Sequence, residues 1–290
     1  MNSKSKYTDH SFRLAEQLNT KDTRFIYELI QNADDNHYLD GVEPFLEFTL
    51  QEEYLKIESN EVGFSPDNIA AISKVGRSTK GSKRGFIGEK GIGFKSVFRI
   101  ARKVHIQSEP YSFAFIYDDD DSGLGMVTPL NEPYLPIRDG VQTQMILHFR
   151  DRHTREQVLD EFLHHLPLTI LLFLKQLKRV TLDIKVPEHA SQRISYSVLP
   201  TDSSPTKNRV TIRKVDGDSS SDYDFWVKKQ QVYDMPPHST RENISQAEVV
   251  LAFPLLDEVP VIESQWISAY LPMRKETFKV RLRIILLASC

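Results

Sequence analysis

The sequence contains a single cysteine among its 290 residues, Cys290, so it can form no disulfide within the chain and no zinc site built from cysteines. It also has no surplus of either charge, because 37 lysines and arginines face 40 aspartates and glutamates. A near-neutral chain offers no basic field that would hold nucleic acid or an anionic membrane. Any anion site must therefore be local, and we expect a reducing, intracellular location, in the cytoplasm or the nucleus.

Long hydrophobic runs are missing as well. The most apolar stretch, residues 166–174, is well short of the roughly 18 to 20 residues that cross a bilayer, so it predicts a buried helix. Residues 1–6 carry charge but no apolar segment of the kind found in secretory signals. With 40% hydrophobic and 10% aromatic residues, the chain has enough apolar material for a core. We therefore expect a globular protein that needs neither a membrane nor nucleic acid as a partner.

The clearest helical pattern covers residues 24–36. At about 100° per residue, the apolar side chains from Ile26 to Ala33 fall on one arc, and Glu28, Asn32 and Asp35 fall together on the opposite side. This pattern predicts a helix with one packing face and one polar face. A carboxylate and a carboxamide four residues apart could activate a water and ligate a hard cation, although a solvated helix face gives the same pattern.

Alternating apolar residues and helix-capping residues predict several other strands and helices. FLEFTL and YLKIES predict two short strands that pair through a three-residue turn within 45–58. Ser65 suits a helix N-cap and Pro66 the first helical position, so a short helix is expected over 66–75. Further strands are expected at 103–108, 111–117, 143–149 and 179–186, a helix in KSVFRIA from residue 95, and helices between about 155 and 177.

Residues 76–93 contain six glycines and five lysines or arginines. Glycine permits close approach of the backbone, so successive N–H groups and the start of the next helix could receive phosphate oxygens. The segment is not a P-loop, because Phe94 stands where lysine is required, and not a dinucleotide fingerprint, because Ser96 stands at the third glycine. A flexible glycine hinge is the alternative interpretation.

The polar stretch 187–208 marks a change of unit. We therefore expect two domains, residues 1–187 and residues 188–290. The second is expected to be an incomplete β-rich domain, because the sequence ends in a long apolar strand that nothing after it covers, which would make the chain a truncated product or a fragment. Its strand-like segments are 209–215, 224–232, 248–256 and 278–290.

Four pieces in this order resemble one family. They are the polar helix face, IESNEVGF at 57–64, GFIGEKGIGFKS at 85–96, and Thr143 before an apolar strand. Together they are similar to the GHKL ATPases, named for gyrase, the heat-shock-ninety chaperones, histidine kinases and MutL, and within these to the sacsin and NO VEIN group. The resemblance covers roughly residues 10–185. It implies an α+β fold of the Bergerat type, a two-layer α/β sandwich with a mixed, mainly antiparallel sheet, and it implies ATP and Mg²⁺ as cofactors.

The resemblance also implies roles for individual residues. Glu28 corresponds to the glutamate that activates water, Asn32 to the asparagine that ligates magnesium, and Asp35 to the acidic residue one turn further along. Thr143 corresponds to the threonine that supports the adenine pocket. The resemblance matches residues 76–87 to a mobile lid and Gly88, Gly91, Gly93, Phe94 and Lys95 to the loop that wraps the triphosphate, with Lys74 and Lys90 as charge partners for phosphate. It also implies nucleotide contacts at Gly63, Ser78, Thr79 and Ile92.

One motif departs from the family pattern Asp-x-Gly-x-Gly, whose aspartate accepts a hydrogen bond from the adenine amino group. With Gly63 aligned on the last glycine, Ser59 stands at the aspartate position and Glu61 at the first glycine. Ser59 or Asn60 could supply the acceptor instead. Because loss of a buried hydrogen bond of this kind costs about 1 to 3 kcal/mol, weaker affinity or looser base selectivity is expected.

The implied function is nucleotide binding with slow, Mg²⁺-dependent ATP hydrolysis that drives a conformational, chaperone-like switch. The expected partners are a nucleotide and a protein client or a second copy of the chain. The alternative is a non-catalytic nucleotide-sensing or scaffold module, which the altered adenine motif favours.

Overall fold

The computed structural model describes residues 23–73, 94–117, 128–200, 208–234 and 247–256, together with the four short strands beyond residue 256. The described residues form one 15-stranded sheet with helices packed against it. The strands are β1 (Phe45–Leu50), β2 (Tyr54–Ser59), β3 (Ala101–Ser108), β4 (Tyr111–Ile116), β5 (Leu130–Asn131), β6 (Thr143–Phe149), β7 (Arg179–Ile184), β8 (Gln192–Val198), β9 (Arg209–Asp216), β10 (Ser219–Val232), β11 (Ala247–Leu256), β12 (Val259–Pro260), β13 (Gln265–Ala269), β14 (Leu271–Glu276) and β15 (Ile284–Leu287).

The strand order is β14-β13-β15-β11-β10-β9-β8-β7-β1-β2-β6-β3-β4-β5, with β12 paired to β11. Neighbours are antiparallel except for two parallel pairs, β1 with β7 and β13 with β15. The helical elements are α3 (Arg24–Asp34), α4 (Pro66–Ile72), the 3₁₀ helix η1 (Lys95–Arg99), α6 (Arg152–Asp160), the π-helical turn η3 (Glu161–His165) and the 3₁₀ helix η4 (Leu168–Phe173). The α+β class with a mixed, mainly antiparallel sheet is therefore confirmed.

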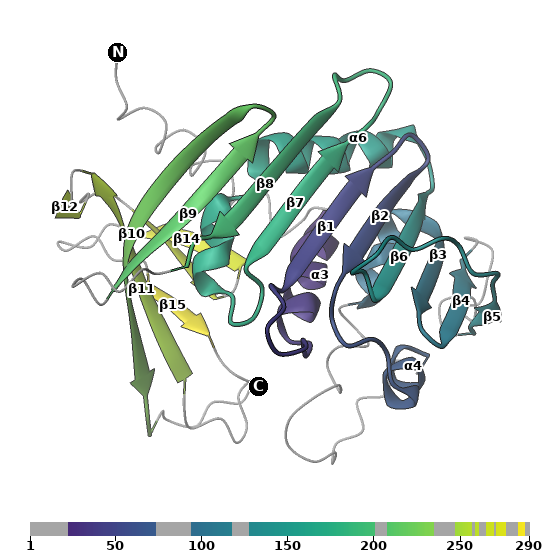
Figure 1. The fold of residues 1–290 in the computed structure, drawn as a ribbon, viewed down its shortest axis with the longest axis horizontal. Helices are drawn as coiled ribbons and strands as arrows, with labels where there is room; N and C mark the ends of the chain where they lie inside the picture. Colours follow the sequence, from purple (N-terminus) through teal and green to yellow (C-terminus); the bar gives the residue numbers. More distant parts are fainter. Residues whose placement is uncertain are drawn as a thin grey trace.

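Strand β1 shows how the sheet is built. Leu46, Phe48 and Leu50 are at most 2% exposed and belong to the core shared with the helices. Successive side chains of a strand point to opposite faces, so Glu47 and Thr49 lie on the other face, and they too are buried. Helices α3 and α6 lie behind the strands in Figure 1, and this arrangement gives the sheet one face covered by helices.

Helix α3 begins and ends close to the predicted bounds, and its apolar arc is buried as expected. Helix α4 stops at Ile72 rather than at residue 75. Its N-terminus matches the prediction, because the Ser65 side chain accepts from the Asn68 N–H while the Asn68 side chain accepts from the Ser65 N–H, a reciprocal capping box.

Two regions differ from the sequence prediction in their helices. KSVFRIA forms a 3₁₀ helix only as far as Arg99, after which β3 begins at Ala101. The helical region between about 155 and 177 is broken once, between η3 and η4, because Leu166 is extended before Pro167, a position that disfavours helical backbone. Before this break, α6 runs directly into η3. The stretch from Leu166 to Leu174 is helical from Leu168 to Phe173, and the side chains of Leu166 and of residues 170–174 join the core as predicted.

The polar stretch interpreted as a change of unit contains a strand, β8, which pairs with β7 on one side and β9 on the other. The sheet therefore continues past residue 187, and the division into two domains stays a prediction. The loop at 76–93 and most of the strand expected at 278–290 lie outside the described residues. Within the described residues, no helix combines the length and the apolar character needed to cross a membrane.

Candidate functional site

A cavity of about 110 Å³ lies where α3, α4 and the sheet meet. This is several times the roughly 10–15 Å³ that one buried water requires. Four of its polar lining residues are Asn32 from α3, Ser59 and Glu61 at the end of β2, and Thr143 at the start of β6. Most of the remaining wall is apolar and includes Leu29, Ala33, Leu46, Ile57, Phe64 and Phe94.

Helix α3 is held at both ends by buried carboxylates. At its N-terminus, Glu161 accepts hydrogen bonds from the Thr23 hydroxyl at 2.9 Å and the Tyr27 hydroxyl at 2.8 Å. Burial and the neighbouring Glu161 carboxylate raise the pKa of Tyr27 well above its usual value, so the phenol stays protonated and keeps donating. At the C-terminus, the Asp34 carboxylate accepts the three backbone N–H groups of residues 175–177, at 2.7 to 3.0 Å. These contacts fix the helix, and with it Asn32, relative to the sheet.

A row of hydroxyl side chains crosses three strands beside the cavity. Thr143 on β6 lies directly opposite Ser59 on β2 and Ser108 on β3, and directly opposed residues share one face of a sheet. The Phe64 N–H donates to Ser108 Oγ at 2.8 Å, the Ser108 and Thr143 hydroxyls lie 2.8 Å apart, and Thr143 Oγ1 donates to Glu61 Oε1 at 2.5 Å. A hydroxyl can accept one bond while donating another, so these groups form one chain that ends on the Glu61 carboxylate.

Gly63 allows this arrangement at the turn after β2. Its φ angle is +90°, a region that side chains other than hydrogen disfavour. A Cβ at this position would also come within 3.2 Å of Ser108 Oγ. The glycine is therefore needed for the turn to approach β3, and it lies outside the cavity lining.

Four of the residues predicted from the sequence converge on the cavity, namely Asn32, Ser59, Phe94 and Thr143. They come from α3, β2, the residue before η1, and β6. Since these segments are far apart in the sequence, their convergence is a property of the fold.

Glu28 and Asn60 lie elsewhere. Glu28 is four residues before Asn32 on α3 and forms an ion pair with Arg24, at 3.6 Å from the Arg24 Nε to Glu28 Oε1. The Asn60 carboxamide accepts the Phe45 N–H at 2.9 Å and donates to the Glu43 carbonyl at 2.9 Å. The oxygen and the nitrogen of the Asn60 carboxamide therefore both bind backbone groups at the start of β1.

The remaining predicted residues are at the rim or outside the described part. Asp35 is the C-cap of α3, and its backbone N–H donates to the Gln31 carbonyl. Lys95 begins η1, and desolvation by partial burial lowers the pKa of its ammonium. The residues that lie outside the described residues are Lys74, Ser78, Thr79, Gly88, Lys90, Gly91, Ile92 and Gly93.

Sequence reasoning assigned no role to two residues that shape the site. The sequence signal for Glu61 is a charged residue at a position where the motif has glycine. The signal for Asp34 is its place on the apolar arc of the helix, four residues after the buried Ile30. An acidic residue on a buried arc indicates a carboxylate with structural hydrogen bonds.

Comparison with known proteins places the chain among relatives of two kinds, while no family model matches it. Over 120 residues, 41% of this chain and 4% of the relative, it is 46% identical to Protein NO VEIN of Arabidopsis thaliana. Over 198 residues it is 30% identical to Chaperone protein HtpG of Nitrobacter winogradskyi, covering 59% of this chain and 30% of the relative. An HtpG of Nitrobacter hamburgensis is 28% identical over 190 residues, 51% of this chain and 29% of the relative. The chain thus spans less than a third of the length of these relatives, and the matches relate it to the heat-shock-ninety-like GHKL ATPases, as predicted.

Proposed function

We propose that this chain is a nucleotide-binding domain that holds ATP and Mg²⁺ in the α3 cavity and hydrolyses ATP slowly. The observation that carries the proposal is the convergence of Asn32, Ser59 and Thr143 on one largely apolar cavity. The resemblance to the GHKL ATPases assigned each of these residues to nucleotide or metal contact independently. Packing of a core alone gives no reason for three polar residues from separate segments to surround one opening.

The sheet side of the cavity suits a nucleobase. Small-molecule pockets are lined mainly by apolar and aromatic side chains, with a few polar groups that fix orientation. Phe64, Phe94 and Ile57 supply apolar wall, and the polar groups at the ends of β2 and β6 stand beside them. A flat, mostly apolar ring with polar edges matches this combination.

The helix side suits the phosphates and the metal. Mg²⁺ prefers oxygen ligands and usually keeps waters and substrate phosphates in its coordination, so the Asn32 side-chain oxygen would be its ligand from the protein. When bound, the ion would neutralise charge on the phosphates. Ile72 and Phe94 both line the cavity. Residues 74–93 lie outside the described residues, and the contacts that the resemblance implies for them with the triphosphate remain part of the proposal.

Glu28 is proposed to orient and deprotonate the attacking water. A positioned base of this kind contributes about 10² to 10⁴-fold to a rate. Its ion pair with Arg24 holds the carboxylate along the helix, 3.6 Å from the guanidinium. Even an exposed pair four residues apart is worth only about 0.3 to 0.5 kcal/mol, and here Arg24 is exposed while Glu28 is partly buried. We therefore propose that the carboxylate leaves Arg24 at little cost when nucleotide binds.

The same ion pair favours a second candidate, a module that binds nucleotide without hydrolysing it, because Glu28 is paired with Arg24 and lies outside the cavity lining. In either case we propose that bound nucleotide changes the conformation of the chain. The HtpG relatives are named chaperone proteins. We therefore propose that the molecule bound in response to this conformational change is a protein client or a second copy of this chain.

Titration with ATP, ADP and GTP, each with and without Mg²⁺, tests the binding site. A ligand that binds only the folded state stabilises it by about 2.7 kcal/mol at a hundredfold excess over Kd, which thermal unfolding and calorimetry both detect. Asn32→Ala should abolish the Mg²⁺-dependent part of this stabilisation. The adjacent Gln31→Ala, outside the cavity lining, should keep it. Absence of any nucleotide effect on the unaltered chain would refute the proposal.

Phosphate release distinguishes the two candidates. Glu28→Ala should abolish release and retain ATP binding if the chain is an ATPase. Arg24→Ala removes the same ion pair but keeps the carboxylate, so it should retain or increase release. Binding without release by the unaltered chain would instead support the non-catalytic module.

A further inference from the structure

Glu61 is a buried carboxylate at the wall of an otherwise largely apolar cavity, with 3% of the residue exposed. The Thr143 hydroxyl donates to its Oε1, and Thr143 in turn is linked through Ser108 to the Phe64 N–H. Hydrogen bonds in such a chain polarise one another. This series of hydrogen bonds holds the Glu61 carboxylate in place, and in it the carboxylate acts as a hydrogen-bond acceptor.

The position of the carboxylate follows from the strand register. Thr143 lies directly opposite Ser59, and the Glu61 Oε1 lies 2.5 Å from the Thr143 hydroxyl. The Glu61 side chain therefore reaches back from the turn to the end of β2, and its carboxylate lies beside Ser59. The Ser59 hydroxyl meanwhile accepts the Glu61 N–H at 3.2 Å, so Ser59 supports the backbone of Glu61.

We propose that Glu61, held by Thr143, determines which base the cavity accepts, by receiving a hydrogen bond from an exocyclic amino group. This inference rests on the proposed nucleotide binding and adds its selectivity. An ionised carboxylate only accepts hydrogen bonds. It attracts a base that presents an amino group at this point and disfavours a base that presents a keto oxygen there. The ligand class is therefore a 6-aminopurine nucleotide rather than its 6-oxo counterpart.

The test compares ATP with ITP, which differ by an amino or a keto group at position 6 of the purine. Calorimetric titrations with Mg²⁺ on the unaltered chain should show ATP binding roughly tenfold or more tighter than ITP, since sites built to bond a polar group reject analogues without it. Glu61→Gln should reverse or abolish this ratio, because its amide can turn its NH₂ toward a keto oxygen. Glu61→Ala should weaken ATP and leave little discrimination.

A matched control is available on β2, three residues before Glu61. Glu58 is also buried, at 2% exposed, but it lies on the opposite face of β2, where Lys56 and Arg138 pair with it. Glu58→Gln should therefore keep the ATP-to-ITP ratio. Thr143→Val removes the donor that holds Glu61 and should reduce the ratio by less than Glu61→Gln does.

The ratio is measured within each variant, so it does not depend on how much of that variant is folded. An unchanged ratio in Glu61→Gln, with ATP still bound by the unaltered chain, would overturn the role of Glu61 and leave the proposed function standing. Failure of the unaltered chain to bind either nucleotide would overturn both.

Discussion

The two faces of the central strands are both buried, but by different chemistry. On the face toward α3, Leu46, Phe48 and Leu50 of β1 pack among the apolar residues of the helices. On the outer face, Glu47 is paired with charged side chains, and the alternate residue Thr49 is buried as well. The same strand therefore serves an apolar core and a charged network at once.

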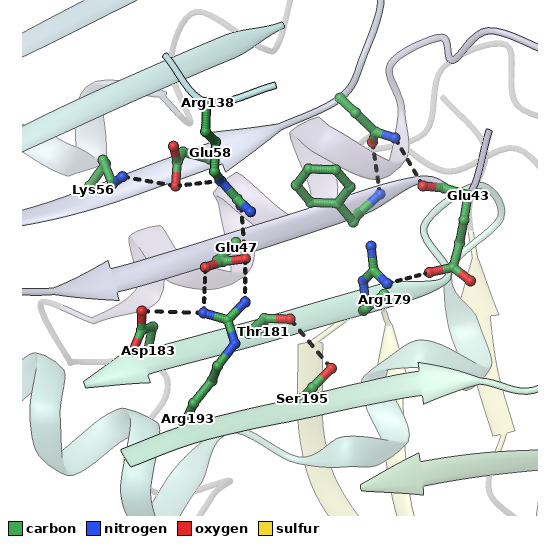
Figure 2. A network of polar contacts seen from close by, with 12 residues as sticks. Glu43, Glu47, Lys56, Glu58, Arg138, Arg179, Thr181, Asp183, Arg193 and Ser195 are labelled. Atoms are coloured by element: carbon green, nitrogen blue, oxygen red, sulfur yellow. Dashed lines mark hydrogen bonds and ion pairs between the residues drawn. The ribbon is translucent and has the colours of Figure 1, made fainter. Parts of the chain in front are cut away.

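The outer network is centred on two arginines. Arg193 donates to both oxygens of Glu47, at 2.8 and 2.9 Å, and lies 3.2 Å from Asp183. Arg138 lies between Glu47 and Glu58, at 2.8 and 3.4 Å (Figure 2). These paired contacts satisfy the carboxylates with charged donors, which form stronger hydrogen bonds than neutral ones.

On the helix side, the buried carboxylates have neutral donors. Asp34 accepts backbone N–H groups, Glu161 accepts two hydroxyls, and Glu61 accepts the Thr143 hydroxyl. The comparison teaches that arginines organise the buried carboxylates of the outer face, whereas hydroxyl and backbone N–H donors hold those of the helix face.

The largest loss of stability is expected from a substitution on the apolar face of β1. Phe48 is fully buried, and its ring lies 5.5 Å from that of Phe162. Phe48→Ala should lower the free energy of unfolding by about 3–5 kcal/mol, because it leaves a cavity as well as removing apolar contact. Denaturant unfolding measures the loss. The next residue supplies the control, since Thr49→Ser on the outer face keeps the hydroxyl and should cost about 1 kcal/mol or less.

The clamp at the end of α3 should give the second largest effect. Asp34→Ala leaves the N–H groups of residues 175–177, of which the contact of Leu177 is buried, without their acceptor, which should cost about 3 kcal/mol in unfolding free energy. The neighbouring Asp35→Ala should change stability by only about 0.5 kcal/mol. Equal losses in the two variants would show that Asp34 does not anchor the helix.

The outer network should contribute less, and its contribution should depend on pH. Burial acts to raise the pKa of Glu47, but the hydrogen bonds and charges of Arg193 and Arg138 outweigh it and hold that pKa below its ordinary value. A lowered pKa in the folded state stabilises the fold above the unfolded value, near 4.5, and this stabilisation is lost as the pH falls through the folded pKa.

Glu47→Gln should accordingly lower the unfolding free energy by about 2 kcal/mol at pH 7, with a smaller difference from the unaltered chain at pH 3. Unfolding in urea at both pH values gives the two differences. Glu43→Gln tests an ion pair with Arg179 in which both side chains are largely exposed, and it should cost at most about 1 kcal/mol. A cost for Glu47→Gln that does not shrink in acid would contradict the assignment.

The sequence predicts local structure well where one pattern determines it. The period of α3, the alternation of β1 and β2 and the N-cap at Ser65 all appear in the structure. The outer network could not be foreseen, because its partners come from strands that become neighbours only when the sheet forms. Arg193 even lies in the stretch interpreted as a change of unit.

The candidate site likewise contains residues that the sequence predicts and one, Glu61, that it does not. Asn32, Ser59, Phe94 and Thr143 were assigned through family motifs, and the fold brings them to one cavity. The direction of the Glu61 side chain depends on the turn at Gly63 and on the pairing of β2 with β6. Spacing in the sequence specifies neither, so this residue emerges only from the three-dimensional arrangement.

The smallest effect is expected from two histidines on the outer face, His105 on β3 and His148 on β6. Burial lowers the pKa of both, and the Lys103 charge lowers it further, against the opposing effect of Glu132. The folded state therefore favours neutral histidines, and it gains stability above the unfolded pKa of about 6.5 that is lost as the pH falls toward the folded values.

Between pH 7.5 and 5, the unaltered chain should lose a few tenths to about 1 kcal/mol through these groups. The double variant His105→Gln/His148→Gln cannot titrate here and should show a flatter pH dependence of unfolding. If the double variant and the unaltered chain lose stability in parallel, the outer face responds to acid only through its carboxylates, and the contrast between the two faces rests on Glu47 and its arginines alone.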